Sequence, residues 1–166
     1  MEKQTAAQPA AAKGQGAFEW YEALISAALV LVLVFSFFFR IIQVDGASMV
    51  PTLQNGDKLI VWGAGYEPQR GDVVIVDSYT AYGKPLVKRV IGLPGDTVSI
   101  QNGYVYINGE KLEESYLPRQ GVTAAGNQEE YVVPEGCLFF LGDNRTNSQD
   151  ARLWDNPYIP VDKVRS

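Results

Sequence analysis

The feature that most constrains this chain is one run of uncharged, mostly apolar residues at positions 23–39. Trp20 precedes the run and Arg40 follows it. An α-helix from Tyr21 to Ile42 is roughly 33 Å long at about 1.5 Å per residue, and the hydrocarbon core of a bilayer is about 30 Å thick. Aromatic residues and a snorkelling arginine are typical of the two membrane interfaces. We therefore expect one membrane-spanning helix here.

Two other interpretations of the apolar run stay open. A cleaved signal peptide has a small-residue cleavage site, whereas this run continues into three phenylalanines, Arg40 and two isoleucines. A core helix of a soluble protein is the second alternative. Lys3 and Lys13 lie before the run and Arg40 lies after it, so charge does not determine the orientation of the helix in a membrane.

Composition divides the chain into parts. Residues 1–19, rich in Ala, Gln and Gly, are expected to form a mobile tail, and residues 20–42 form the anchor. Residues 43–166 are long enough for one domain with a hydrophobic core. The net charge of −5 lies entirely in that part, so nothing suggests a nucleic-acid-binding surface. Cys137 is the only cysteine, which excludes an intramolecular disulfide and a cysteine-ligated zinc site.

The part after the anchor has the pattern of a β-domain. Short apolar or alternating runs, bounded by Gly, Pro, Asn and Asp, predict strands. These lie at 58–62, 72–77, 86–91, 97–101, 104–108, 131–133 and 137–141. Asn102-Gly103, between two of them, predicts a tight hairpin. We expect a mainly β fold, in which a single N-terminal transmembrane helix is followed by an antiparallel or mixed, coiled, barrel-like β-sheet.

Ser48 lies shortly after the apolar run, in the turn-prone stretch 45–53. A serine hydroxyl is a poor nucleophile until a neighbouring group accepts its proton. Histidine, the usual partner, is absent from the chain. If Ser48 is catalytic, its base must be a lysine or a carboxylate.

Lys88 is the candidate base. In the strand predicted at 86–91, Lys88 and Arg89 point to opposite faces, each between apolar neighbours. A strand with one wet face would collect its charges there, so we expect at least one cation to be partly desolvated. Desolvation that lowers a lysine pKa from about 10.4 to about 8 costs roughly 3 kcal/mol and favours the neutral amine, which can accept a proton from Ser48. The alternative is an edge strand whose cations both reach water.

A polar loop follows the strand predicted at 137–141. It supplies opposite charges that can pair and a hydroxyl that can orient a lysine amine. The candidates are Asp143 with Arg145 or Arg89, Asp150 with Arg152, and Ser148. Taken alone, these residues are also compatible with an ordinary solvated loop.

Together, these segments resemble the bacterial type I signal peptidases, membrane-anchored Ser/Lys proteases that remove signal peptides from exported proteins. The resemblance runs from the anchor to about Pro160 and rests on motifs in a fixed order. They are Ser48-Met49 with Pro51-Thr52-Leu53, Arg70-Gly71-Asp72-Val73-Val74, Lys88-Arg89-Val90-Ile91-Gly92 with Pro94-Gly95-Asp96, and Gly142-Asp143-Asn144-Arg145 with Ser148, Asp150 and Arg152. Unrelated β-domains are not expected to supply all of these in order.

The resemblance implies a role for each site residue. Ser48 would attack the scissile carbonyl and form an acyl-enzyme, while Lys88 would accept its proton and later activate the deacylating water. Ser148 would hydrogen-bond the Lys88 amine. The supporting ion pairs that the resemblance implies are Asp143 with Arg89 and Asp150 with Arg152.

Some positions depart from the family pattern. Gly46 stands where longer relatives have an oxyanion-hole serine, so backbone N–H groups, chiefly that of Ser48, are expected to stabilise the oxyanion. Gly46 either shares the backbone geometry of those relatives or needs a positive φ that serine tolerates poorly. Met49 is expected at the substrate-binding site, resting on the bilayer or filling the core. Ala151 replaces a serine, and the chain stops at Ser166 where the family continues, which predicts a shortened form or an open sheet edge.

The resemblance also implies the surroundings of the protein. The tail would be cytoplasmic, the anchor would cross the plasma membrane once, and the catalytic domain would lie on the extracytoplasmic face. Substrates would be preproteins with small residues one and three positions before the cut, bound extended against a strand edge. Membrane lipid is the other partner, no nucleic acid, metal or organic cofactor is implied, and we expect a monomer.

Two rival functions remain. A Ser/Lys self-cleaving repressor would need a DNA-binding domain in place of the anchor. A membrane-tethered, non-enzymatic β-domain that acts as a binding module is the rival from another class, and it would leave a preprotein intact.

Overall fold

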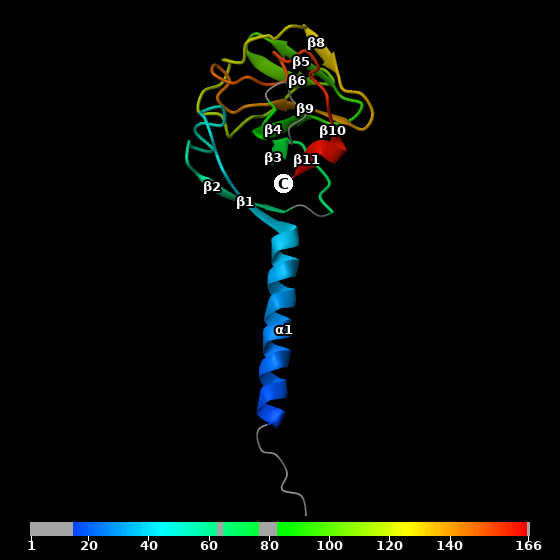
Figure 1. Ribbon diagram of the computed structural model, residues 1–166. Helices are drawn as coiled ribbons and strands as arrows, with labels where there is room; N and C mark the ends of the chain where they lie inside the picture. The colour runs from blue at the N-terminus through cyan, green and yellow to red at the C-terminus, as the bar shows by residue number, and fades with distance from the viewer. Residues whose placement is uncertain (1–14, 63–64, 77–82, 166) are drawn as a thin grey trace, which may run out of the picture. The chain divides into compact units, whose positions relative to one another are not determined.

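The computed structural model describes residues 15–62, 65–76 and 83–165, and it contains one long helix and a mainly β unit (Figure 1). The chain forms two compact units, one ending at Phe38 and one beginning at Phe39. The helix is α1 (Gln15–Phe38), and the other elements are β1 (Phe39–Gln43), β2 (Lys58–Trp62), β3 (Val73–Val76), β4 (Leu86–Gly92), β5 (Thr97–Gln101), β6 (Tyr104–Ile107), β7 (Glu110–Lys111), β8 (Glu130–Val132), β9 (Cys137–Leu141), β10 (Ile159–Pro160), the 3-10 helix η1 (Val161–Lys163) and β11 (Val164–Arg165).

Helix α1 is long and apolar enough to cross a membrane over the 19 residues Phe18–Ser36. It ends at Phe38, whereas the sequence predicted a helix as far as Ile42. The prediction for residues 39–42 was wrong because apolar character alone does not separate helix from strand. Here β-branched Ile41 and its neighbours pair with β2 instead, as β-branched residues favour.

Strands β1 and β2 pair only with each other among the strands of the described ranges. On one face, the rings of Phe39 and Trp62 meet edge to face with centroids 4.9 Å apart, and Ile41 lies opposite Ile60. Both isoleucines are 73% exposed. Val61, on the other face, is only 4% exposed. We refer to Phe39, Ile41, Ile60 and Trp62 as the apolar ribbon face.

The largest sheet has the order β10-β9-β4-β3-β11 (Figure 1). In its ladder Lys88 lies opposite Val74 on β3, and Arg89 lies opposite Leu141 on β9. Strand β4 therefore has a neighbour on each side. This position excludes the edge-strand alternative for Lys88 and Arg89, because a strand within a sheet is covered along both edges.

The second sheet has the order β7-β6-β5-β8, and it packs with the first around one apolar cluster, while a second cluster is formed by residues of the first sheet. Asn102 (φ 51°) and Gly103 (φ 84°) make the β5–β6 turn, as the hairpin signal predicted. Successive residues of β4 contribute to different clusters, Val90 to one and Ile91 to the other. Both faces of β4 are thus covered by apolar side chains, and its cations are desolvated for that reason.

The mainly β, antiparallel prediction is confirmed, since every strand pairing among the described residues is antiparallel. All the predicted strands are present, with ends shifted by a single residue at most where the structure describes them, and the predicted last residue of the strand at 72–77 lies outside the described residues. Strands β1, β7, β10 and β11 were not predicted. An open sheet edge was one of the two alternatives for the end of the chain, and β11 covers the edge of β3 by pairing with it.

Candidate active site

Ser48 lies in the turn segment between β1 and β2, and this segment is fastened to the loop that follows β9. The backbone N–H of Asn144 donates to the carbonyl of Ser48 (2.9 Å), and its side-chain amide donates to the carbonyl of Ala47 (3.0 Å). The hydroxyl of Thr52 donates to Asp143. The candidate nucleophile is therefore held by contacts to residues far along the chain.

Lys88 is 2% exposed in the middle of the largest sheet. Burial lowers the pKa of Lys88 to about 8, the nearby Asp150 and Asp143 oppose this, and Arg152 adds to it. The Nζ atom forms no hydrogen bond or ion pair with any residue in the described ranges. With this pKa roughly a tenth of the molecules have a neutral Lys88 at pH 7, far more than at the ordinary lysine pKa, and a neutral amine can accept a proton.

Gly142 is the point at which the candidate residues converge. Continuing the pairing of Arg89 with Leu141 by one residue places Lys88 opposite Gly142. A Cβ at Gly142 would lie 2.1 Å from the Ser148 hydroxyl oxygen and 2.5 Å from the Ser48 carbonyl oxygen. Only glycine allows so close an approach, so the backbone at this position touches both serines.

Two buried ion pairs flank Lys88. Arg89 donates to both oxygens of Asp143, at 2.8 and 2.6 Å, which decides between the partners considered for that aspartate. Arg152 donates to both oxygens of Asp150, at 2.8 and 2.9 Å. Asp150 also accepts the N–H of Gly142 at 3.0 Å. These bidentate contacts hold the loop after β9 against β4.

A third buried ion pair, between Glu114 and Arg145, was missed by the sequence analysis. Their side chains are 2% and 1% exposed. Glu114 precedes Arg145 by 31 residues and lies in a segment without regular secondary structure. No periodic sequence pattern therefore predicts that the two residues form an ion pair. The sequence offered one indirect signal. Arg89 and Arg145 were both considered as partners of Asp143, so whichever of them does not pair with Asp143 requires another carboxylate.

A groove of about 210 Å³ opens beside Ser48. Its walls come from two stretches of chain, the end of β1 with the residues after it and the start of β4 with the residues before it. The lining residues are Ile42, Gln43, Val44, Asp45, Ser48, Met49, Lys84, Pro85, Leu86 and Val87. We refer to this as the Ser48 groove.

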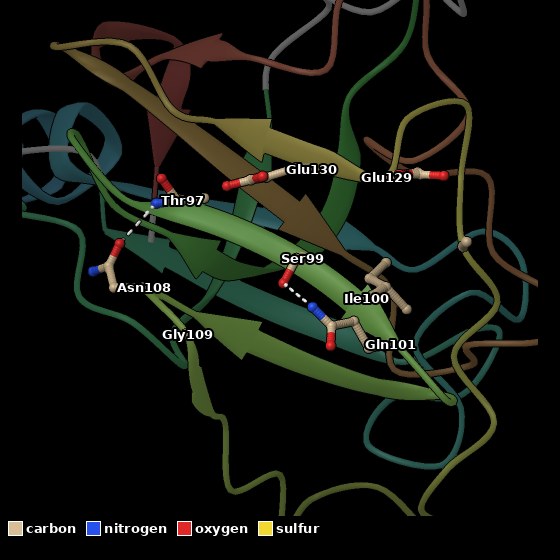
Figure 2. A pocket seen from close by; sticks show the side chains of 9 residues that line it. Thr97, Ser99, Ile100, Gln101, Asn108, Gly109, Glu129 and Glu130 are labelled. Atoms are coloured by element: carbon tan, nitrogen blue, oxygen red, sulfur yellow. Dashed lines mark hydrogen bonds between the residues drawn. The ribbon is translucent and has the colours of Figure 1, made fainter.

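A larger hollow of about 760 Å³ lies on the second sheet. Figure 2 shows Thr97, Ser99 and Gln101 of β5 along it, with Asn108 and Glu130 beside them. Neither Ser48 nor Lys88 lines this hollow. Its size therefore does not make it the reaction site. Among the described residues, no group of three or more His, Cys, Asp or Glu side chains is arranged to hold a metal ion.

Residues 17–166 match the family model described as signal peptidase, peptidase S26. The chain belongs to the signal peptidase family. A signal peptidase I of Bacillus licheniformis is 41% identical over 163 residues, which cover 92% of this chain and 86% of that protein. Signal peptidase I T of Bacillus subtilis (strain 168) is 39% identical over 162 residues, covering 91% and 83%. A crystal structure of a signal peptidase I from Enterococcus faecalis V583 is 32% identical and covers 60% of this chain and 94% of that chain, with a TM-score of 0.48.

The family match includes helix α1, and this apolar helix is consistent with the membrane anchor of a signal peptidase I. Ser148 differs from the expectation for this family. Its hydroxyl is buried and has no hydrogen-bond partner among the described residues, so the expected bond to Lys88 is not formed. The hydroxyl lies against the Gly142 backbone instead, and catalytic hydrogen bonds are often long until substrate is bound.

Gly46 and Met49 resolve the alternatives left open for this peptidase. Gly46 has a φ of +106°, so it does not have a backbone that serine adopts easily, and its N–H donates to Asn55 (2.8 Å). It is therefore not free to serve as an oxyanion donor, whereas the Ser48 N–H makes no hydrogen bond within the described part of the chain. Met49 is 1% exposed. This burial excludes the alternative that Met49 rests on the bilayer and favours core filling, and Met49 also lines the Ser48 groove.

Proposed function

We propose that Ser48 and Lys88 are the catalytic dyad with which this signal peptidase removes signal peptides from secreted preproteins. The observation that carries the proposal is the state of Lys88. It is a buried lysine without an ionic partner in the described ranges, and its pKa is about 8. Folded proteins rarely maintain such a group without a chemical use for it.

In the proposed reaction, neutral Lys88 accepts the Ser48 proton as the serine oxygen attacks the scissile carbonyl. The N–H of Ser48 stabilises the oxyanion that develops. Lys88 then gives its proton to the departing amine of the mature protein, which leaves an acyl-enzyme. A water deprotonated by Lys88 hydrolyses that ester and releases the signal peptide. Ser148 orients the amine once substrate is bound.

The flanking ion pairs limit how far the two nearby carboxylates raise the pKa of Lys88. Asp143 and Asp150 each raise the pKa of Lys88, and unpaired carboxylates so close would favour its charged form. Because Arg89 and Arg152 bind these carboxylates, the local charge is largely cancelled. We therefore assign the four residues a supporting role rather than a part in proton transfer.

The Ser48 groove is proposed to bind the preprotein in an extended conformation. Its walls are the end of β1 with the two residues after it and the start of β4 with the two residues before it, and an extended peptide can bind beside strand ends of this kind. The groove is proposed to accept the small residues one and three positions before the cut.

The arrangement in the membrane is part of the same proposal. Residues 1–19 form a cytoplasmic tail and α1 crosses the plasma membrane once. The domain that begins after α1 carries the site and lies on the extracytoplasmic face, where exported preproteins emerge. We propose that the protein acts as a monomer, since every candidate site residue comes from one chain.

The test is cleavage of a preprotein by the purified full-length protein in detergent. Ser48→Ala and Lys88→Ala should each lower the rate by about 1000-fold or more, because each removes one half of a single proton transfer. Lys88→Arg should fail equally, since guanidinium stays protonated. Ser99→Ala and Lys111→Arg, on the second sheet, are the matched controls and should cleave normally.

Near-normal cleavage by a Ser48 or Lys88 variant would refute the dyad. A preprotein that stays intact in the presence of the wild-type protein would favour a binding module.

A further inference from the structure

Residues 112–129 join β7 to β8 without regular secondary structure, yet part of this segment is buried. Glu114 is 3% exposed and Thr123 is 2% exposed. Connecting segments normally lie on the surface, and a buried carboxylate is costly unless it is paired. The burial of this polar segment therefore calls for a specific set of partners.

Arg145 supplies those partners and connects the segment to the loop after β9. Its guanidinium donates two hydrogen bonds to Glu114 and one to the hydroxyl of Thr123 (2.9 Å). Its Nε donates to the carbonyl of Gly142 at 3.0 Å. The carbonyl of Arg145 accepts from Arg152 at 3.0 Å. One arginine thus ties Glu114 to the backbone on which the candidate dyad converges.

Tyr116 reaches the other side of the site. Its ring lies 3.8 Å from the guanidinium carbon of Arg89, the residue after Lys88. Its hydroxyl donates to Glu114 at 2.8 Å. Burial and the carboxylate of Glu114 raise the pKa of Tyr116, so the hydroxyl remains a donor at any working pH. Glu114 and Tyr116 therefore act on both neighbours of Lys88, the Gly142 backbone and Arg89.

We propose that Glu114 and Tyr116 are positioning residues for the Ser48–Lys88 dyad, an inference that rests on the function proposed above. Glu114 holds Arg145, and Arg145 holds Gly142, whose backbone lies against Ser48 and Ser148. A misplacement of about 1 Å can cost about 100-fold in rate. Neither positioning residue lines the Ser48 groove, so they affect turnover and not the groove itself.

The first test is Glu114→Gln, which removes the charge and keeps the shape. The turnover number should fall about tenfold or more while KM stays within about twofold. The pH of half-maximal turnover should also rise, because a loosened Gly142 admits water to Lys88 and weakens the desolvation that lowers its pKa. Glu113→Gln is the matched control, since Glu113 is the exposed neighbour with the same charge, and it should leave all three quantities unchanged.

Two further variants separate positioning from mere stability. Tyr116→Phe keeps the ring over Arg89 and removes the hydroxyl's hydrogen bonds to Glu114 and Arg145. Turnover should therefore fall and the pH midpoint should rise, each by less than in Glu114→Gln. The double variant Glu114→Leu with Arg145→Met removes both buried charges together, which often costs little stability, and it also removes the hydrogen bonds from Arg145 to Thr123 and Gly142. Its thermal midpoint should approach that of the wild type while its turnover stays low.

Recovery of both thermal midpoint and turnover in the double variant would overturn the inference, because the pair would then serve stability alone. A folded Glu114→Gln variant with wild-type turnover and pH midpoint would overturn it as well. If Glu114→Gln does not fold, wild-type behaviour of Tyr116→Phe decides against it. Full activity of Ser48→Ala would instead refute the proposed dyad, whereas an inactive Ser48→Ala beside an unaffected Glu114→Gln would refute only the positioning role.

Discussion

Strand β4 buries charged side chains, whereas the β1–β2 ribbon exposes apolar ones. Lys88 and Arg89 on β4 are almost completely buried, whereas Ile41 and Ile60 on the ribbon are 73% exposed. Hydrophobicity alone would predict the reverse. The difference arises because β4 has a strand on either edge and apolar clusters on both faces, while the ribbon has only one covered face. Neighbours, and not the residue type, decide burial in each region.

The two regions also differ in the free-energy cost of these buried charged and exposed apolar residues. A buried cation must be paired or have a lowered pKa, and β4 contains one of each kind, the paired Arg89 and Lys88 with a pKa of about 8. An exposed isoleucine has no comparable penalty. Substitutions on β4 should therefore have large effects, and substitutions on the apolar ribbon face should have small ones.

The largest effect is expected from breaking the pair that holds Arg89. Asp143→Asn removes the charge without changing the shape, and it leaves a buried guanidinium uncompensated. The free energy of unfolding should fall by about 3–5 kcal/mol. Denaturant titration of the purified protein measures this. Asp162→Asn is the control, because Asp162 pairs with Lys163 on the surface and should cost less than about 1 kcal/mol. Equal losses in the two variants would contradict the importance of burial.

The next effect concerns the cation that has no pair. Cleavage should rise with pH and reach half its maximum near the Lys88 pKa of about 8. Below that value the neutral fraction falls about tenfold per pH unit, so the rate at pH 6 should be roughly 100-fold below the plateau. The unfolded chain keeps this proton up to about pH 10.4, so the burial of Lys88 opposes folding most below pH 8 and less as the pH rises above it. A rate that is already maximal at pH 5 would point to a carboxylate base.

A smaller effect is expected at Gly46, which lies between the ribbon and the nucleophile. The φ of +106° is unfavourable for serine, although no atom lies within 4 Å of a Cβ at this position. Gly46→Ser should lower the free energy of unfolding by about 1–2 kcal/mol and should not raise turnover. Gly109→Ser is the control, with a φ of +84° and equal space, and it should lose similar stability with unchanged turnover. A more active and equally stable Gly46→Ser would restore the shared-geometry alternative.

The smallest effect is expected on the apolar ribbon face. Ile60→Thr keeps a β-branched side chain at an exposed position, so the free energy of unfolding should change by less than about 0.5 kcal/mol. The same kind of change at Val90 of β4, which is 0% exposed, buries an unpaired hydroxyl and should cost about 1–3 kcal/mol. Comparing Ile60→Thr with Val90→Thr by thermal unfolding tests the contrast directly.

Much of the fold was predictable because period-two alternation and turn residues are local signals. They located β2 to β6, β8 and β9, and they located the hairpin at Asn102-Gly103. Strand β1 was missed because its residues continue an apolar run with no break in composition. Strands β7, β10 and β11 have two residues each, too few for any periodic pattern.

The contacts of the candidate site were predictable only between residues that belong to one sequence motif. Asp150 and Arg152 are two residues apart, and their pairing follows from the loop itself. Glu114 and Arg145 meet through tertiary packing alone, and nothing in either local sequence indicates the other. The positive φ of Gly46 was likewise undetermined, because glycine permits that conformation without requiring it.

The contacts that fasten Ser48 to the loop after β9 have a consequence for the order of synthesis. Thr52 and Asp143 are 91 residues apart, and Ala47 and Asn144 are 97 residues apart. A ribosome therefore makes Ser48 and Lys88 well before it makes the loop that orients them, and chains fold from the N-terminus as they emerge. A chain that ends before this loop has both proposed reactive groups without the contacts that orient them.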